Sequence, residues 1–401
     1  MYKLAVCKIG QRISFGKIDK NGSRLPVVDT SGGNGEAKAV IDIARKSGKF
    51  DITILTMTTK SDYFPPEYKI VDIVKLMQEG KLDSFIKEQD FDVLLLINGT
   101  ISCYGGLEKF ALLDLATYRA TKLFDKKIVF VSCDICIPFV ADMWKRIHLK
   151  PWVGKYNREE HLLLDKDIHM LTQARNLDVL YDILESRRGY VNVFKRENIE
   201  NFPFEKFPCD NEVNYIPVNP SPEYDLLYGG TLRTGRRIKN IVKWYYNHPS
   251  LNIELFGRMD QEKIDEFAKK ECGDSFYKPK FADPVNYNEH SKKMNQALAT
   301  IVIGDTMYEQ TDTVQQRAYE AMCANVVTFI DERLDRPHNV YGCNSGLEKF
   351  LYLQSPGQLE KKIVMLKENP ELRAKILEWQ QRIINFDKQS WYNEFAEKLL
   401  K

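Results

Sequence analysis

Short apolar runs alternate with amphipathic segments along almost the whole chain. The runs have the length and β-rich composition of buried strands, and the segments between them, such as residues 35–49 and 106–124, repeat apolar positions with the helical period. Near-continuous apolar strands separated by helices are typical of parallel sheets covered on both faces. The pattern therefore predicts an α/β fold, with strands at residues 2–9, 50–57, 92–99, 127–133, 167–173, 191–195, 224–230, 252–257, 298–305 and 325–331.

A proline-rich break divides this series into two halves. Residues 197–225 hold five prolines and show no periodicity, which is typical of a connection between domains. Because each half carries its own strand–helix series, we expect two Rossmann-like doubly wound domains facing a central cleft. The expected bounds are residues 1–196 for the first domain, 197–222 for the linker and 223–385 for the second domain. In such folds ligands bind beyond the carboxyl ends of the strands.

Composition narrows the functional classes. The 401 residues are 43% hydrophobic and carry a net charge of +2, so nucleic-acid binding would have to come from local patches. The chain has no secretory signal pattern and no apolar run near the about 18 residues that a membrane helix requires. Eight scattered cysteines favour a reducing, cytoplasmic compartment. The pair Cys133 and Cys136 lacks a second pair, so a metal site built from side chains is not expected.

The stretch "YGGTLRTGRR", residues 228–237, follows an apolar run and precedes an amphipathic one. Gly229 and Gly230 allow the backbone to turn and to approach a ligand closely, with Thr231 next in the turn. Arg233 and Arg237 lie where a helix is expected to begin, and arginines there oppose the helix dipole unless an anion is present. The loop therefore indicates an anion site, although a solvated basic turn would contain the same residues.

Other strand ends in the second half support a nucleotide as the anion. Gly257 ends "ELFG", and "VIGD" ends in Asp305. In "QQRAYEAM", Arg317 and Glu320 lie three positions apart at the start of an apolar helix. A cation for phosphate and a carboxylate for ribose hydroxyls are what a nucleotide diphosphate requires. No P-loop motif is present.

The strand ends of the first half differ. "TSGGNGE" enters a helix with Glu36 expected in its first turn, which favours a sugar loop because a carboxylate would repel phosphate. The polar loop "NGTISCYGG" exposes Tyr104. Asp134 follows the apolar run "KIVFVSC", where desolvation would raise its basicity and suit a general base. An N-cap for the following turn is the alternative.

In order along the chain, these strand ends resemble the T-even bacteriophage DNA β-glucosyltransferase family. The similarity is densest in "LLINGTISCYGG", "SCDICIPF", "KPWVGKYNREEHLL", "YDLLYGGTLRTGRR", "NIELFG", "ALATIVIGD" and "QRAYEAMCANVVTFIDE". Members are inverting GT-B enzymes that transfer glucose from UDP-glucose to 5-hydroxymethylcytosine in duplex DNA. The resemblance implies a UDP-sugar-dependent DNA glycosyltransferase that protects phage DNA from restriction, as a monomer in the cytoplasm of the infected host.

The resemblance also implies roles for individual residues. It assigns Asp134 as the catalytic base, with Glu36 as a carboxylate on the sugar side of the cleft. It assigns the diphosphate to Arg233, Arg237 and Arg317, and the ribose to Glu320. The remaining donor-site residues are Gly229, Gly230, Thr231, Gly257 and Asp305, and the DNA-facing loop comprises Ser102, Cys103, Tyr104 and Gly105.

Two further features follow from the resemblance. A divalent cation, Mg²⁺ or Mn²⁺, is implied as a cofactor that is bound mainly through the UDP diphosphate. Residues 386–401 form a terminal amphipathic helix that is implied to cross back to the first domain. The target base in duplex DNA would have to be flipped out for attack, and Arg187, Arg188, Lys195 and Arg196 could contact DNA phosphates or form a solvated helix end.

Departures from the family pattern keep alternatives open. Cys136 replaces an arginine two residues after the catalytic aspartate, and the Gly-rich residues 31–36 follow a longer connection. These changes lie on the sugar and acceptor side, so a related donor such as UDP-arabinose is the alternative to UDP-glucose. A glycosyltransferase for a small molecule or glycan would share the arginines. A non-catalytic DNA-binding module is a third class, and a nicotinamide-dependent oxidoreductase would require a G-x-G-x-x-G motif that is absent.

Overall fold

The computed structural model describes residues 1–9, 13, 32–57, 67–98, 107–132, 166–186, 194–210, 215–230, 235–285, 287–342 and 346–401. The chain divides into two compact units. The first comprises Met1–Gln173, Leu177–Pro203 and Asp387–Lys401, and the second comprises Ala174–Asn176 and Phe204–Phe386.

The first unit is built on a parallel sheet with the strand order β3-β2-β1-β4-β5-β6-β7 in its described part. This order is that of a doubly wound dinucleotide-type fold, in which the strand order reverses between β1 and β4. The strands are β1 (Tyr2–Ile9), β2 (Phe50–Thr56), β3 (Lys69–Asp72), β4 (Val93–Asn98), β5 (Lys127–Ser132), β6 (Ile168–Thr172) and β7 (Ile199–Asn201). The helices are α1 (Gly32–Lys46), α2 (Ile73–Gln78), α3 (Leu82–Gln89), α4 (Leu107–Leu123), α6 (Leu177–Ser186), η4 (Arg196–Asn198) and α15 (Lys388–Leu400).

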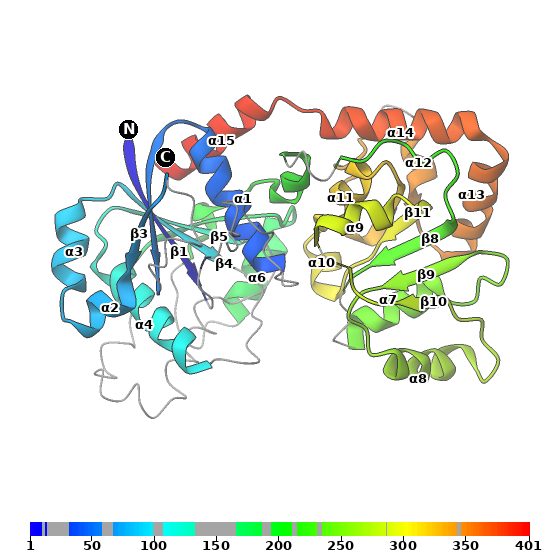
Figure 1. Cartoon of the computed structure of the whole chain (residues 1–401), viewed down its shortest axis with the longest axis horizontal. Coiled ribbons are helices and arrows are strands. Elements are labelled where there is room, and N and C mark those ends of the chain that lie inside the picture. Colours follow the sequence, from blue (N-terminus) through cyan, green and yellow to red (C-terminus); the bar gives the residue numbers. More distant parts are fainter. Residues whose placement is uncertain are drawn as a thin grey trace, which may run out of the picture. The chain divides into compact units, whose positions relative to one another are not determined.

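The second unit repeats this design with the strand order β10-β9-β8-β11-β12-β13 (Figure 1). Its strands are β8 (Tyr224–Gly229), β9 (Ile253–Phe256), β10 (Lys280–Ala282), β11 (Ala297–Val302), β12 (Val327–Asp331) and β13 (Tyr352–Leu353). Its helices are η5 (Phe204–Asp210), α7 (Gly235–Tyr245), α8 (Gln261–Cys272), α9 (Tyr287–Met294), α10 (Thr306–Gln310), α11 (Arg317–Cys323), η7 (Glu332–Leu334), α12 (Glu348–Leu351), α13 (Pro356–Glu368) and α14 (Pro370–Ile384). The prediction of two doubly wound α/β units is confirmed.

The terminal helix α15 belongs to the first unit, as the resemblance implied, and lies beside α1 (Figure 1). Asp387 caps it by accepting a hydrogen bond from the Ser390 amide at 3.1 Å. The ring of Trp391 stacks on that of Phe202 with centroids 5.4 Å apart, and Phe395 packs on the same ring at 5.3 Å. Burial of these aromatic rings anchors the end of the chain to the first sheet.

The central strands lie where the apolar runs predicted them, but the short edge strands β3, β7, β10 and β13 were not anticipated. Of the predicted strand at 191–195, residues 191–193 lie outside the described residues, and Phe194 and Lys195 are not in a strand. The stretch 197–222 is more than a connection, because it supplies β7 to the first sheet and η5 to the second unit. An edge strand has one neighbour and needs no long apolar run.

Candidate functional site

The carboxyl edge of the second sheet brings two glycine turns into contact. The amide of Gly230, just after β8, donates a hydrogen bond to the Phe256 carbonyl at 2.9 Å. Gly257, just after β9, has φ +133°, and a Cβ there would lie 1.9 Å from the Gly230 carbonyl oxygen. Only glycine fits this approach of two backbones, so the ends of β8 and β9 pack backbone against backbone at the sheet edge.

Gly257→Ala is expected to lower the free energy of unfolding by about 3 kcal/mol or more, because the methyl group meets backbone at a φ that favours glycine. Urea denaturation measures this loss. Gly48→Ala is the matched control, since Gly48 also has a positive φ of 70° but nothing lies within 4 Å of its Cβ position. The control should lose about 1 kcal/mol, and an equal loss in the two variants would contradict the steric argument.

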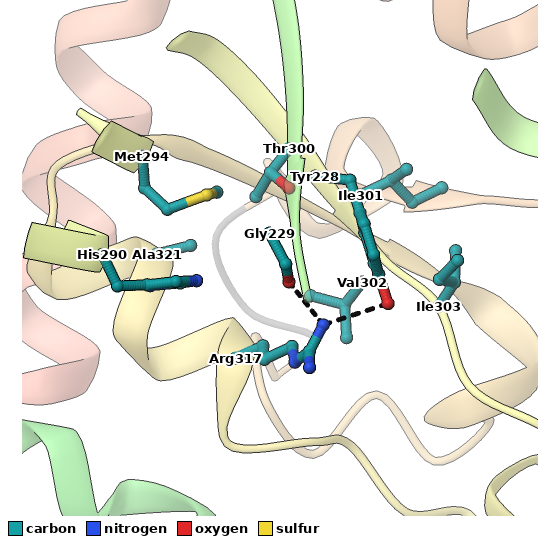
Figure 2. A pocket seen from close by; sticks show the side chains of 10 residues that line it. All are labelled: Tyr228, Gly229, His290, Met294, Thr300, Ile301, Val302, Ile303, Arg317 and Ala321. Atoms are coloured by element: carbon teal, nitrogen blue, oxygen red, sulfur yellow. Dashed lines mark hydrogen bonds between the residues drawn. The ribbon is translucent and has the colours of Figure 1, made fainter. Parts of the chain in front are cut away.

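Arg317 is the first residue of α11, and its side chain lies against the turn formed by Gly229 and Gly230 (Figure 2). Its Nη1 donates to the Tyr228 hydroxyl at 3.0 Å and to the Gly229 carbonyl oxygen. The guanidinium carbon lies 5.4 Å from the centroid of the Tyr228 ring, and a Cβ on Gly230 would lie 1.8 Å from Nη1. A fixed cation therefore stands directly over the turn from which sequence patterns predicted an anion site.

Tyr228 is held in turn by the core. Its ring packs edge-on against Tyr245 with centroids 5.5 Å apart, and the Tyr245 hydroxyl donates to the Ile301 carbonyl at 2.9 Å. Burial raises the pKa of Tyr245, so this phenol stays neutral. Because Tyr245 belongs to α7 and Ile301 to β11, the position of Arg317 depends on three elements far apart in the chain.

A pocket opens beside this guanidinium (Figure 2). Met294 and Ala321 line it and belong to the buried apolar cluster under the sheet edge. The half-buried ring of His290, from α9, lies across from Arg317 and packs on Phe256 with centroids 5.3 Å apart. The full lining is Tyr228, Gly229, His290, Met294, Thr300, Ile301, Val302, Ile303, Arg317 and Ala321.

The other predicted donor-site residues of the second unit are placed as follows. Glu320 is buried in α11, one turn after Arg317, and acts electrostatically on His290. Arg237 is half-buried in α7. Asp305 is the N-cap of α10, where its carboxylate accepts from the Met307 amide at 3.0 Å, so it has a structural function without any ligand.

Several predicted residues lie outside the described residues. They are Thr231 and Arg233 of the donor site, Asp134, and the loop residues Ser102, Cys103, Tyr104 and Gly105. Glu36 lies in α1, but its side chain is not described. One detail is corrected: α1 begins at Gly32, so Glu36 is the fifth helical residue and lies beyond the first turn. The glycines extend the helix in place of the predicted loop.

Part of the suggested DNA-contacting patch is engaged within the first unit. Lys195 pairs with Asp167 at 2.7 Å, and Arg196 pairs with Asp178. These pairs are exposed and weak, so they could exchange for other anions. Arg187 and Arg188 lie outside the described residues.

Sequence reasoning missed two residues of the site, Tyr228 and His290. Tyr228 stood in the quoted motif, but an aromatic residue in a buried strand is ordinarily core. His290 had no signal in the sequence, because a lone histidine in a polar helix matches no motif. Sheet order brings both residues to Arg317.

The described part of the chain contains no cluster of three or more His, Cys, Asp or Glu side chains arranged to bind a metal ion. Among the same residues, no helix combines the length and the apolar character needed to cross a bilayer.

Two doubly wound α/β units, with a cation held over a glycine turn at one sheet edge, are the architecture found in GT-B glycosyltransferases. Solved structures agree. The T4 phage enzyme in complex with its UDP-glucose substrate superposes with a TM-score of 0.72, at 22% identity over 99% of both chains. Its complex with UDP and Mn²⁺ gives 0.73, at 23% identity over 99% of both chains. An O-GlcNAc transferase mutant from Thermobaculum terrenum gives 0.51, at 10% identity over all of this chain and 68% of that chain.

Sequence comparison finds similarity to the same group of enzymes. The family described as bacteriophage T4 beta-glucosyltransferase matches residues 67–208. The DNA beta-glucosyltransferase of Enterobacteria phage T4 is 27% identical over 336 residues, which are 82% of this chain and 89% of the relative. The chain is therefore similar to the T4 β-glucosyltransferase family, over residues 67–208 by the family model and over 82% of its length by the phage T4 enzyme.

Proposed function

We propose that this protein transfers glucose from UDP-glucose to the hydroxymethyl group of 5-hydroxymethylcytosine in double-stranded DNA, with inversion at the anomeric carbon. The observation that carries the proposal is the Arg317 guanidinium fixed over the Gly229–Gly230 turn. Similarity to the T4 enzyme supports it, because that relative is a DNA β-glucosyltransferase and its solved complex holds UDP-glucose.

The second unit would bind the donor. Arg317, together with Arg233 and Arg237, would hold the diphosphate, and Glu320 would accept hydrogen bonds from the ribose hydroxyls. The glycines at 229, 230 and 257 carry no side chains, so a phosphate could approach the backbone of the turn closely, with Thr231 in the same turn and Asp305 at the end of the neighbouring strand segment. Bidentate guanidinium groups suit phosphate in both charge and geometry.

A divalent cation fits this site as a partner of the nucleotide. The lining of the pocket contains a guanidinium, an imidazole and the hydroxyls of Tyr228 and Thr300 but no carboxylate among its described residues, and Asp305 is occupied as a helix cap. This donor set suits a cation that would be held mainly through the diphosphate rather than by protein carboxylates. When bound, Mg²⁺ or Mn²⁺ would neutralise charge on the leaving diphosphate. A complex of the T4 enzyme contains UDP and Mn²⁺.

The first unit would supply the acceptor chemistry. Asp134 follows the last residue of β5 by two positions, and it would take the proton from the hydroxymethyl oxygen as that oxygen attacks the anomeric carbon. The bond from this carbon to the phosphate oxygen breaks, and the arginines stabilise the charge that develops on the leaving UDP. Glu36 would contact the sugar. Residues 102–105 would face DNA and occupy the gap left by the flipped base.

Mass spectrometry of nucleosides tests the proposal. The purified protein is incubated with duplex DNA containing 5-hydroxymethylcytosine and with UDP-glucose or UDP-arabinose, and the DNA is then digested. A gain of one hexose with UDP-glucose is expected, and DNA containing only cytosine should gain nothing. If the DNA gained only a pentose, the transferred sugar would be arabinose and not glucose. If the protein bound UDP but the DNA gained no sugar, the acceptor would instead be another base, a glycan or a small molecule.

We also expect the protein to act as a monomer in the cytoplasm of an infected bacterium. Light scattering during gel filtration, with and without DNA, measures the oligomeric state.

A further inference from the structure

The imidazole of His290 lies at the turn that would receive the nucleotide. A Cβ on Gly229 would lie 2.5 Å from its Nε2, so this nitrogen is directed at the backbone of the turn. The ring and Arg317 line the same pocket from two different helices, α9 and α11 (Figure 2). His290 is therefore placed to reach a ligand that Arg317 holds.

The hydrogen-bonding capacity of this ring is not used within the described part of the chain. There, the ring packs on Phe256, and its effects on other side chains are electrostatic. A neutral imidazole carries one donor and one acceptor nitrogen. The ring is half-buried, so a ligand in the pocket could serve as a hydrogen-bond partner of either nitrogen.

We propose that His290 is a further donor-binding residue, whose Nε2 hydrogen-bonds an oxygen atom of the nucleotide diphosphate held over the Gly229–Gly230 turn. The inference rests on the proposed function, because it takes the donor to be a nucleotide sugar. It adds a polar contact to a pocket that Met294 and Ala321 also line.

The electrostatics of the pocket give this contact a distinct signature. Burial lowers the pKa of His290, the nearby positive charge of Arg317 lowers it further, and Glu320 opposes both effects. Tyr228 is the titratable group that β8 adds to the pocket, and α9 itself carries Glu289, Lys292 and Lys293. In the free protein the ring is therefore neutral at neutral pH.

A bound diphosphate would offset the charge of Arg317 and raise the pKa of His290. The complex then binds more protons than the free protein between the two pKa values. By linkage, affinity for UDP-glucose should rise as pH falls through that window, and it should be independent of pH above it. The diphosphate of UDP-glucose is a diester without a group that titrates near neutral pH, so proton uptake would belong to the protein.

Isothermal titration calorimetry of the full-length protein with UDP-glucose tests the inference. His290→Leu removes the hydrogen bond and keeps the apolar volume, so affinity should fall about tenfold at neutral pH. His290→Gln keeps a side-chain donor that does not titrate, so affinity should stay within about threefold while its pH dependence disappears. Buffers with different ionisation enthalpies report the proton uptake directly.

His248→Gln is the matched control, because burial also lowers the pKa of His248 and this residue lies outside the pocket lining. It should leave affinity and pH dependence unchanged. If the unmodified protein does not bind UDP-glucose, the proposed function fails. If it binds, and if both His290 variants retain its affinity and pH profile, the inference about His290 is overturned while the proposed function stands. Thermal unfolding without ligand confirms that the variants are folded.

Discussion

Arg317→Ala is expected to lower the rate of sugar transfer by about 10²- to 10³-fold. The guanidinium faces the position where negative charge develops as UDP leaves, and no other described residue lining the pocket carries a permanent positive charge. Removing it also leaves the Tyr228 hydroxyl and the Gly229 carbonyl without this donor. Steady-state kinetics with 5-hydroxymethylcytosine DNA, together with the Kd for UDP, would measure both effects.

Two variants separate charge from position. Tyr228→Phe removes one hydrogen bond to Arg317 but keeps the guanidinium, so a loss of about tenfold or less is expected. Arg317→Lys keeps a charge but loses the planar fork, and its activity should lie between those of the other two variants. If Arg317→Ala were no worse than Tyr228→Phe, the assignment of Arg317 to the diphosphate would be wrong.

Asp134→Asn is expected to lower kcat by about 10²- to 10⁴-fold, which is the range for loss of a general base. The amide has nearly the same shape but cannot accept the hydroxymethyl proton. Since the donor would bind to the second unit, affinity for UDP-glucose should stay within about twofold. Single-turnover transfer and calorimetric binding measure the two quantities separately.

The result for Asp134→Asn distinguishes three interpretations of Asp134. Loss of transfer with intact donor and DNA binding supports a base. Activity within about tenfold of the unmodified protein would make Asp134 a helix cap or a neighbour of the site. Unchanged biological function would instead favour a non-catalytic DNA-binding module, and it would contradict the proposed reaction.

Much of the candidate site in the second unit could be predicted from short stretches of sequence. Gly229, Gly230 and Gly257 each stand at the end of an apolar run, where a strand must turn. The spacing of three between Arg317 and Glu320 places both residues in the first turn of α11. These signals are local, because strand and helix periods span only a few residues. The same reasoning placed Asp305 at a strand end, but it could not separate a ligand contact from the helix cap that the structure shows.

The sequence by itself determined the α/β class, the central strands of both sheets and the glycine turns, since burial on both faces demands long apolar runs. Only the tertiary structure decided that Arg317 bonds to Gly229, 88 positions earlier, and that His290 meets the same turn. It also assigned β7 and α15 to the first unit. These contacts depend on which strands become neighbours in the sheet. The order of the strands depends on how the whole unit packs, and the local periodicity of the sequence contains no information about it.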